Sequence, residues 1–193
     1  FLERFGFGGC LADDMGLGKT IQVLALLEVR REQRPNGKEN LPSLVVVPRS
    51  LVFHWKREAS AFAPKLHILG HTGATRLKPG DHFADYDVVL TTYGTLRRDA
   101  LQFKDQHFDY CILDEAQAIK NSGTLSAKAV RLLGADHRLA MSGTPVENHL
   151  GELWSVFSIV FPGLLGSWDQ FRDRYAIPIE RHHVAEAREA LSR

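Results

Sequence analysis

The sequence predicts an α/β fold, an open and mostly parallel sheet with helices on both faces. Three observations lead to this prediction. Strand-like and helix-like segments alternate along the 193 residues. The run Leu44–Val47 is uninterrupted and rich in β-branched residues, which is typical of a parallel strand covered on both faces. A glycine-containing loop, 13–18, lies between an apolar run and a helical pattern.

Strands are expected where short apolar runs are bounded by turn residues. They cover 9–12, 44–47, 66–69, 88–91, 110–113 and 138–141. Ligands of such sheets bind beyond the carboxyl ends of the strands. We therefore expect the functional edge in the loops after Ala12, Val47, Leu90, Leu113 and Met141.

Helices are expected where apolar residues recur at three- and four-residue spacing. The first covers Thr20 to about Gln33, and a second follows Ser50, which is expected to be its N-cap. The buried face of the second helix should carry Val52, Trp55, Ala59 and Phe62. Further helices are expected over 125–133, 149–160, 168–175 and 184–191.

Composition excludes several classes of protein. The hydrophobic fraction of 44% and charged fraction of 24% are those of a globular chain, and the net charge of +1 gives no nucleic-acid footprint by itself. Cys10 and Cys111 lie in apolar runs, which favours a reducing compartment over a disulfide scaffold. No run approaches the ~20 apolar residues of a membrane span, and we expect no membrane partner. The 9 histidines have no metal-ligand spacing, and Trp55 and Trp154 are expected in the core.

The strongest motif is a phosphate-binding loop between a strand and a helix. Its nucleotide-binding candidates are Asp13, Asp14, Met15, Gly16, Leu17, Gly18, Lys19 and Thr20. The glycines let successive N–H groups face one anion, and the helix that follows adds its positive dipole end. Lys19 is expected to reach the β- and γ-phosphates, and the Thr20 hydroxyl to bind Mg²⁺. The alternative is an ordinary glycine-rich turn.

Two acids end the strand 110–113. Asp114 is expected to hold Mg²⁺, and Glu115 to orient and deprotonate an attacking water. Taken alone, an acid pair after a strand is also typical of a solvated turn. A third segment, Ser142–Pro145, follows the last strand. There Ser142, Gly143 and Thr144 are candidates for sensing the γ-phosphate and coupling its loss to a neighbouring lobe, or for a plain turn.

Together these segments resemble the Swi/Snf-type ATPases, which are DNA translocases of helicase superfamily two. The resemblance spans nearly the whole chain in the expected order: motif I at 11–22, motif Ia at 45–51 with Trp55 and Glu58, motif Ib at 90–96, motif II at 114–117 with 119–121, and motif III at 142–148. The runs 152–155 and 161–166 resemble the segment that follows motif III.

The resemblance implies a RecA-like P-loop NTPase lobe at 1–160, which binds ATP and Mg²⁺, and the start of a helical appendage at 161–193. A second RecA-like lobe, absent from this chain, would supply arginine fingers and half of the DNA track. The motif II position usually held by His is Gln117, a variant typical of bacterial members, and we include it among the catalytic candidates. In isolation the chain is expected to bind nucleotide weakly and to be nearly inactive.

The resemblance also implies double-stranded DNA as partner, and a DNA-bound protein as remodelling target. Phosphate contacts are expected from Arg49, Ser50, Thr92, Tyr93 and Gly94, although each is equally typical of a cap or turn. We expect Arg97 and Arg98 to be solvated helix charges. The protein would lie in the cytoplasm, at the nucleoid, if bacterial and in the nucleus if eukaryotic.

Two other functions stay open at this point. One is a non-catalytic nucleotide- or DNA-binding module that kept the fold, against which the intact Lys19, Thr20, Asp114 and Glu115 argue. The other is a different phosphoryl-transfer enzyme, such as a small-molecule kinase, which would have a lid and a substrate pocket within one domain. The chain begins without Met, and we expect it to be part of a longer polypeptide.

Overall fold

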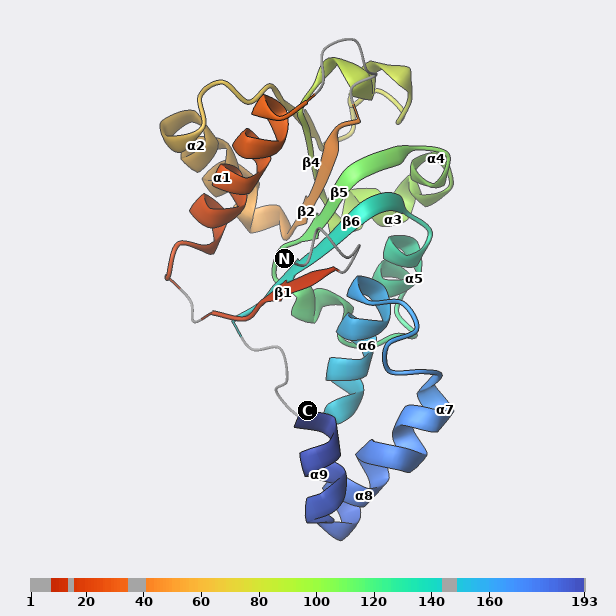
Figure 1. Cartoon of the computed structure of the whole chain (residues 1–193). Helices are drawn as coiled ribbons and strands as arrows, with labels where there is room; N and C mark the ends of the chain where they lie inside the picture. Colours follow the sequence, from red (N-terminus) through yellow and green to blue (C-terminus); the bar gives the residue numbers. More distant parts are fainter. Residues whose placement is uncertain (1–7, 14–15, 35–40, 144–148, 193) are drawn as a thin grey trace.

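The computed structural model describes residues 8–13, 16–34, 41–143 and 149–192. Within them, six strands form one sheet in the order β1-β6-β5-β2-β4-β3, and every neighbouring pair is parallel (Figure 1). The strands are β1 (Gly9–Leu11), β2 (Ser43–Val47), β3 (Ile68–His71), β4 (Val88–Thr92), β5 (His107–Leu113) and β6 (Gly134–Met141). The predicted parallel α/β fold is confirmed.

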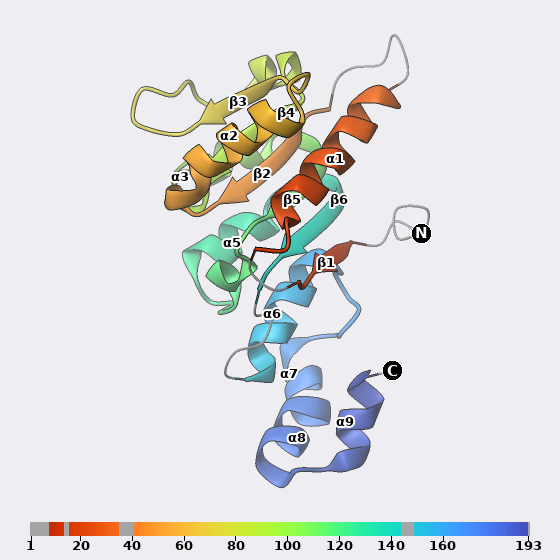
Figure 2. The same cartoon turned by 90° about the vertical axis from the view of Figure 1, so that its left-hand side faces the viewer.

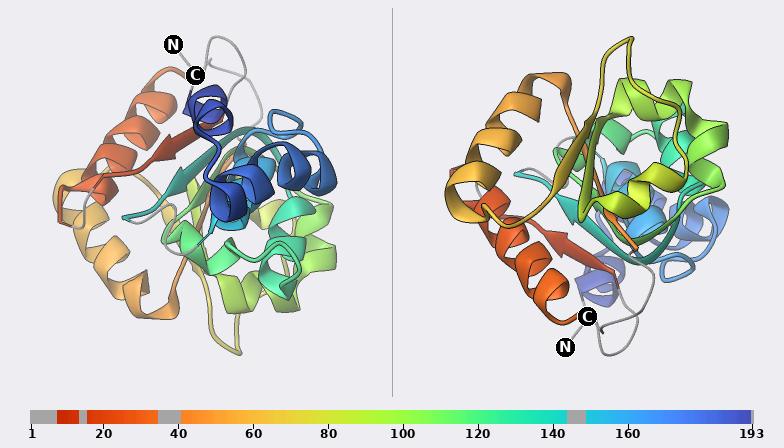
Figure 3. Two further views of the ribbon diagram at one scale, coloured as in Figure 1. Left: turned by 90° about the horizontal axis from the view of Figure 1, so that it is seen from below. Right: turned by 90° about the horizontal axis from the view of Figure 1, so that it is seen from above.

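Helices cover both faces of this sheet. On one face lie α1 (Lys19–Glu32) and α2 (Val52–Phe62), and on the other α3 (Tyr93–Arg98), α4 (Ala100–Lys104), α5 (Leu125–Arg131) and α6 (Leu150–Val160). Figure 2 shows α1 and α2 in front of the strands, and the right-hand view of Figure 3 separates the two helical layers.

The side chains of β2 point alternately to the two faces of the sheet and contribute to a hydrophobic core on each. Val45 and Val47 pack toward α1 and α2, while Leu44 and Val46 pack toward the opposite layer. All four side chains are fully buried, because successive strand residues point to opposite faces and both faces are covered. The uninterrupted apolar run is thereby explained.

The register aligns the carboxyl ends of the strands at one edge. Leu11 pairs with Met141, Leu113 with Ala140, and Val47 with Thr92. Asp13, the acids at 114–115 and residues 142–143 therefore leave the sheet side by side. This alignment positions the candidate site.

A helical extension follows Phe161. It comprises α7 (Trp168–Phe171), the π-helical turn η5 (Arg172–Ala176), α8 (Ile177–His182) and α9 (Ala185–Ser192), which project below the sheet in Figure 1. Ser167 caps α7 through a capping box with Gln170, and Phe171 is 1% exposed. The predicted helical character of this part is confirmed, whereas its separation as a domain stays a prediction.

Several boundaries differ from the sequence prediction. Ser50 is not an N-cap: a 3-10 turn, η2 (Arg49–Leu51), follows Pro48, and α2 begins at Val52 without a side-chain cap. Phe62 is 58% exposed rather than buried. Strand β3 begins at Ile68, because the N–H of Leu66 first closes a turn onto the carbonyl of Ala63.

The sequence analysis did not identify α3, α4 or α8, which have five or six residues each. Segments this short carry too few turns for a helical period to stand out. Among the described residues, no helix combines the length and the apolar character needed to cross a bilayer.

Candidate active site

The loop before α1 has the backbone of an anion cradle. Gly16 and Gly18 have φ of 86° and 74°, and a Cβ at either position would be strained although nothing lies in its way. Gly18 is the N-cap residue of α1, whose first N–H groups face outward from the helix end. Asp14 and Met15 lie outside the described residues.

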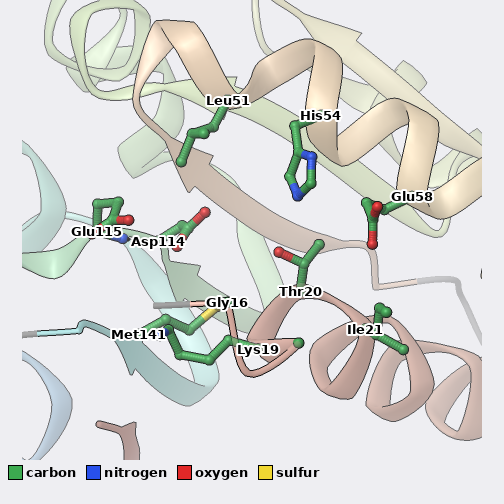
Figure 4. A pocket seen from close by; sticks show the side chains of 11 residues that line it. Gly16, Lys19, Thr20, Ile21, Leu51, His54, Glu58, Asp114, Glu115 and Met141 are labelled. Carbon is green, nitrogen blue, oxygen red and sulfur yellow. Dashed lines mark hydrogen bonds between the residues drawn. The ribbon is translucent and has the colours of Figure 1, made fainter. Parts of the chain in front are cut away.

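One hollow of about 360 Å³ brings together the two predicted halves of the site. Lys19 and Thr20 reach it from the start of α1, and Asp114 and Glu115 from the end of β5 (Figure 4). The remaining lining residues are Gly16, Gly18, Ile21, Leu51, His54, Glu58 and Met141. Segments almost 100 residues apart in the sequence therefore share one cavity.

Lys19 is directed back onto its own loop. Its Nζ donates to the backbone carbonyl of Asp13 at 2.6 Å. Asp13 stands where such a loop usually has its first glycine. Its backbone carbonyl, rather than its side chain, accepts this hydrogen bond from Lys19. Lys19, Gly16 and Gly18 line the same cavity, in which an ammonium group and backbone N–H donors would suit one anion.

Asp114 is a buried carboxylate held by hydrogen bonds, with 5% exposure. Oδ2 accepts from the indole Nε1 of Trp55 at 2.7 Å, and Oδ1 accepts from the N–H of Glu115 at 2.9 Å. Burial raises the pKa of Asp114 above its ordinary value, while these two hydrogen bonds oppose the rise. A nearby cation would favour the charged carboxylate further.

Glu115 has a constrained backbone. Its φ of 49° lies in the left-handed region, which is uncommon for a residue with a side chain and is found at functional sites. The 3-10 turn η4 (Ala116–Ile119) follows directly. The conformation turns the chain sharply at the strand end, so that Asp114 and Glu115 both line the cavity.

Gln117 links the second acid to the end of β6. Its amide Nε2 donates to Glu115 Oε2 at 2.5 Å, and its Oε1 accepts from the Ser142 hydroxyl at 3.1 Å. Ser142 is 1% exposed, and its N–H donates to the carbonyl of Leu11. Gly143 follows at the strand end, whereas Thr144 lies outside the described residues.

The oxygen donors in the cavity suit Mg²⁺. The Thr20 hydroxyl and the Asp114 carboxylate are the hard ligands that this ion prefers, and it normally combines one or two such protein groups with phosphate oxygens and water. The donor set therefore fits a magnesium-nucleotide, which Thr20 and Asp114 would hold.

A second hollow, of about 600 Å³, lies beside the first α2 turns; we call it the basic groove. It is lined by Arg49, Val52, Phe53, Lys56, Thr72, Gly73, Ala74, Thr92, Thr95 and Arg98. Three cationic side chains and three threonines make it suited to a phosphate backbone. Of the residues predicted to bind DNA, Arg49 and Thr92 line it, while Ser50 and Gly94 are exposed.

Tyr93 requires a correction. Its side chain is 8% exposed, and its hydroxyl donates to the backbone carbonyl of Asp114 at 2.8 Å. Because the ring is packed in the core beneath α3, the side chain is not available to DNA. Through this hydrogen bond, the Tyr93 side chain instead holds the backbone of Asp114, the first residue of the acid pair.

Sequence reasoning missed several lining residues. In the cavity these are Leu51, His54 and Glu58, which follow one another at helical spacing; once α2 is placed, that spacing identifies them. In the basic groove Phe53 and Lys56 share another face of α2, and Arg98 lines the hollow although we expected a solvated charge. Residues 72–74 also line the basic groove, but they belong to no motif that the sequence analysis identified.

A parallel sheet whose edge carries a glycine loop with lysine and an acid pair defines a RecA-like α/β lobe. The family model described as the SNF2-related domain matches residues 2–193, so the chain belongs to this family. The chain is 45% identical over 184 residues to the putative ATP-dependent helicase/translocase YwqA of Bacillus subtilis (strain 168), a match that covers 94% of this chain and 20% of the relative.

Two further similarities agree. The TATA-binding protein-associated factor MOT1 of Saccharomyces cerevisiae is 38% identical over 189 residues, or 93% of this chain and 10% of the relative. The solved structure of the Sulfolobus solfataricus SWI2/SNF2 ATPase core in complex with dsDNA superimposes with a TM-score of 0.89 at 42% identity, covering 99% of this chain and 39% of that one. The chain thus spans a fifth or less of these curated relatives.

Proposed function

We propose that this SNF2-family ATPase domain is the first lobe of an ATP-dependent translocase on double-stranded DNA. The observation that carries the proposal is the shared cavity of Lys19, Thr20, Asp114 and Glu115. These are the groups that phosphoryl transfer to water requires: a phosphate cradle, a metal-holding pair and a base. Family membership supports ATP as the nucleotide.

Each residue has a distinct task in the proposed reaction. The Gly16–Gly18 backbone and Lys19 bind and orient the phosphates, and Thr20 and Asp114 hold Mg²⁺. When bound, that ion neutralises charge on the phosphate oxygens. Glu115 would orient a water molecule in line with the γ-phosphorus and accept its proton as the water oxygen bonds to that phosphorus. The bond from the γ-phosphorus to the bridging β-phosphate oxygen breaks, which gives ADP and phosphate.

The chain of hydrogen bonds from Glu115 through Gln117 to Ser142 suits a coupling role. It joins the proposed base to the end of β6, where Ser142 and Gly143 would communicate with a partner lobe. Thr144 is proposed for the same task. In this proposal Gln117 positions Glu115 rather than touching the phosphate.

The basic groove is the proposed DNA surface. Arg49, Lys56 and Arg98 would pair with phosphates of one strand, and Thr92 and Thr95 would add hydrogen bonds. Such contacts position a duplex without reading its sequence. The similar solved core is in complex with dsDNA, which supports this assignment.

The remaining parts of the proposal concern the whole protein. The lobe at 1–160 and the appendage beginning at 161 would act with a second RecA-like lobe, which completes the ATP site and the DNA track. A DNA-bound protein is the proposed target, in line with the name of the MOT1 relative. We propose a location at the nucleoid or, in a eukaryote, in the nucleus.

The test is the ATPase rate of the full-length polypeptide, with and without duplex DNA, compared with its Glu115→Gln variant. We expect duplex DNA to raise the rate, and the variant to lose roughly 10²- to 10⁴-fold while still binding ATP. A rate that DNA leaves unchanged would remove the translocase assignment. Absence of MgATP binding would favour a non-catalytic module.

A further inference from the structure

Asp114 is supported from two helices that the proposed chemistry does not use. Trp55, on α2, donates its indole N–H to the carboxylate, and Tyr93, on α3, donates its hydroxyl to the carbonyl of the same residue. The distances are 2.7 and 2.8 Å, and both side chains are buried. They hold one residue from opposite faces of the sheet.

These bonds leave Asp114 little freedom. Its N–H donates to the Val46 carbonyl, its carbonyl accepts from Tyr93, and its two carboxylate oxygens accept from Trp55 and from the Glu115 N–H. Buried hydrogen bonds to a charged group contribute more than neutral ones, and the loss of one leaves an unpaired oxygen. The side-chain orientation is therefore determined by Trp55.

The same two helices line the basic groove. On α2, Phe53 and Lys56 flank Trp55 and face the groove, while Trp55 turns inward. At α3, Tyr93 is flanked in the same way by Thr92, the N-cap residue at the end of β4, and by Thr95. A rigid shift of either helix on ligand binding would thus be transmitted directly to Asp114.

We propose that Trp55 and Tyr93 are positioning residues for Asp114, and that they form the contact through which occupancy of the basic groove reaches the metal-holding carboxylate. The inference rests on the proposed function and deepens it. Neither residue touches the nucleotide. Trp55 sets the carboxylate orientation, and Tyr93 fixes the strand end on which that carboxylate stands.

The test uses the full-length polypeptide with Trp55→Phe, which retains an aromatic ring but removes the donor. Binding of a non-hydrolysable ATP analogue is measured by calorimetry with Mn²⁺ or with a chelator, each with and without duplex DNA. We expect about tenfold weaker binding in the presence of Mn²⁺ and unchanged binding without metal. The factor by which DNA alters affinity should fall toward one.

Two more variants sharpen the test. Trp154→Phe is the matched control, since the indole of Trp154 likewise donates to an oxygen, the carbonyl of Gly166 at 3.2 Å, but lies far from Asp114 along the chain and outside the cavity. It should bind as the wild type does. Tyr93→Phe removes one oxygen atom, and we expect several-fold weaker binding with Mn²⁺. This variant decides the matter if Trp55→Phe does not fold.

The outcomes separate the claims. Folded variants whose Mn²⁺ dependence equals that of the wild type would overturn the positioning roles. Weaker metal-dependent binding with an unchanged DNA effect would overturn the link to the groove. If the wild type itself binds nucleotide no better with metal, the proposed function fails, and the inference with it.

Discussion

Among single residues, Lys19 and Glu115 divide the proposed work of the cavity between binding and chemistry. Lys19 lies beside the glycine loop with its ammonium on the Asp13 carbonyl, while Glu115 stands at the end of β5 and is held by Gln117. In the proposal, Lys19 would contact phosphate throughout the reaction, whereas Glu115 would contact only the attacking water. Replacing each should therefore give different defects.

We expect Lys19→Ala to weaken ATP binding by roughly 10- to 150-fold, because hydrogen bonds to a charged group contribute about 1.5–3 kcal/mol. Lys65→Ala is the control, since Lys65 is exposed and outside the cavity. Calorimetric titration with MgATP checks both. Near-normal affinity in Lys19→Ala would remove the lysine from the phosphate site.

Gly18 is the second position where a single residue decides the local structure. With φ of 74° at the N-cap of α1, a Cβ costs roughly 1–2 kcal/mol. We expect Gly18→Ala to lower the free energy of unfolding by about that amount, as measured by urea denaturation. Gly123→Ala, at an exposed glycine without positive φ, should change stability less. Equal losses of stability in Gly18→Ala and Gly123→Ala would contradict the expected backbone strain at Gly18.

The phosphate-binding loop and the acid pair could be predicted because each motif consists of residues that are adjacent in the sequence. Asp13–Thr20 and Asp114–Glu115 each form a local pattern, and a parallel sheet brings strand ends to one edge. The hydrogen bonds that Trp55 and Tyr93 donate to Asp114 could not be predicted. They join residues that are 59 and 21 positions apart, respectively, and they depend on how α2 and α3 pack. Tyr93 illustrates the limit, because nothing local distinguishes a buried ring from an exposed one.

At the scale of elements, the edge strand β3 ends at a buried histidine that contacts a half-buried ion pair. His71 is 2% exposed between the rings of Phe83 and Phe103, and its Nε2 lies 3.4 Å from Asp99. Asp99 in turn accepts two bonds from Arg76 at 2.7 Å, which holds the 72–76 loop against the α3–α4 corner. Residues 72–74 of that loop line the basic groove.

This buried histidine makes stability depend on pH. Burial lowers the pKa of His71 below its ordinary value, with Arg76 and His82 adding to the effect and Asp99 opposing it. Between the folded pKa and the unfolded value of about 6.5, the unfolded chain binds more protons, so stability rises with pH. The contribution is complete above about pH 6.5 and declines as pH falls below it.

We therefore expect the free energy of unfolding, measured by urea between pH 5 and 8, to decrease below about pH 6.5. His71→Gln should flatten this slope. His67→Gln, at an exposed histidine nearby, should leave it in place. A slope that survives in His71→Gln would assign the effect to other groups.

The basic groove gives a prediction at the same scale. Each phosphate contact from a lysine adds about one to the dependence of log Kd on log salt concentration. Lys56→Ala should therefore weaken duplex binding evenly across sequences and reduce that slope by roughly one. Lys65→Ala should change neither. Fluorescence anisotropy at several salt concentrations measures both quantities, and an unchanged slope would take Lys56 out of the interface.

Strands were predicted more completely than helices, for a physical reason. A buried parallel strand is a continuous apolar run, as in β2 and β4, and stands out wherever it occurs. Helices α3 and α4 span fewer than two turns each, so they show no long helical period; packing stabilises both, and the Thr92 cap stabilises α3. The first halves of β5 and β6 were missed because polar residues interrupt them, at His107 and Asp109 in β5 and at Asp136 and His137 in β6.

At the scale of the whole molecule, the proposed ATP site lies at one edge of the sheet, and in the proposal the partner lobe would cover it there. The cavity lies at the carboxyl edge of the sheet, and the residues proposed for coupling, Ser142 and Gly143, leave that edge. Catalysis of phosphoryl transfer usually needs positive charge opposite the cradle. In the proposal this comes from the second lobe.

We expect the chain alone to bind MgATP weakly and to turn over negligibly, with or without duplex DNA. Addition of the second lobe, within the same polypeptide, should restore DNA-stimulated hydrolysis. A coupled phosphate-release assay on both proteins at equal concentration measures the difference. Vigorous hydrolysis by the chain alone would contradict the need for a partner.

The strand order has a consequence for biosynthesis. Strand β1 is made before the other five strands of the sheet, yet its neighbour in the sheet is β6, which ends at Met141. On the ribosome the first strand therefore has no place to dock until more than 120 further residues have emerged. The glycine loop attached to it is anchored only at that moment, so the proposed capacity to hold nucleotide would arise only after the central strands have assembled.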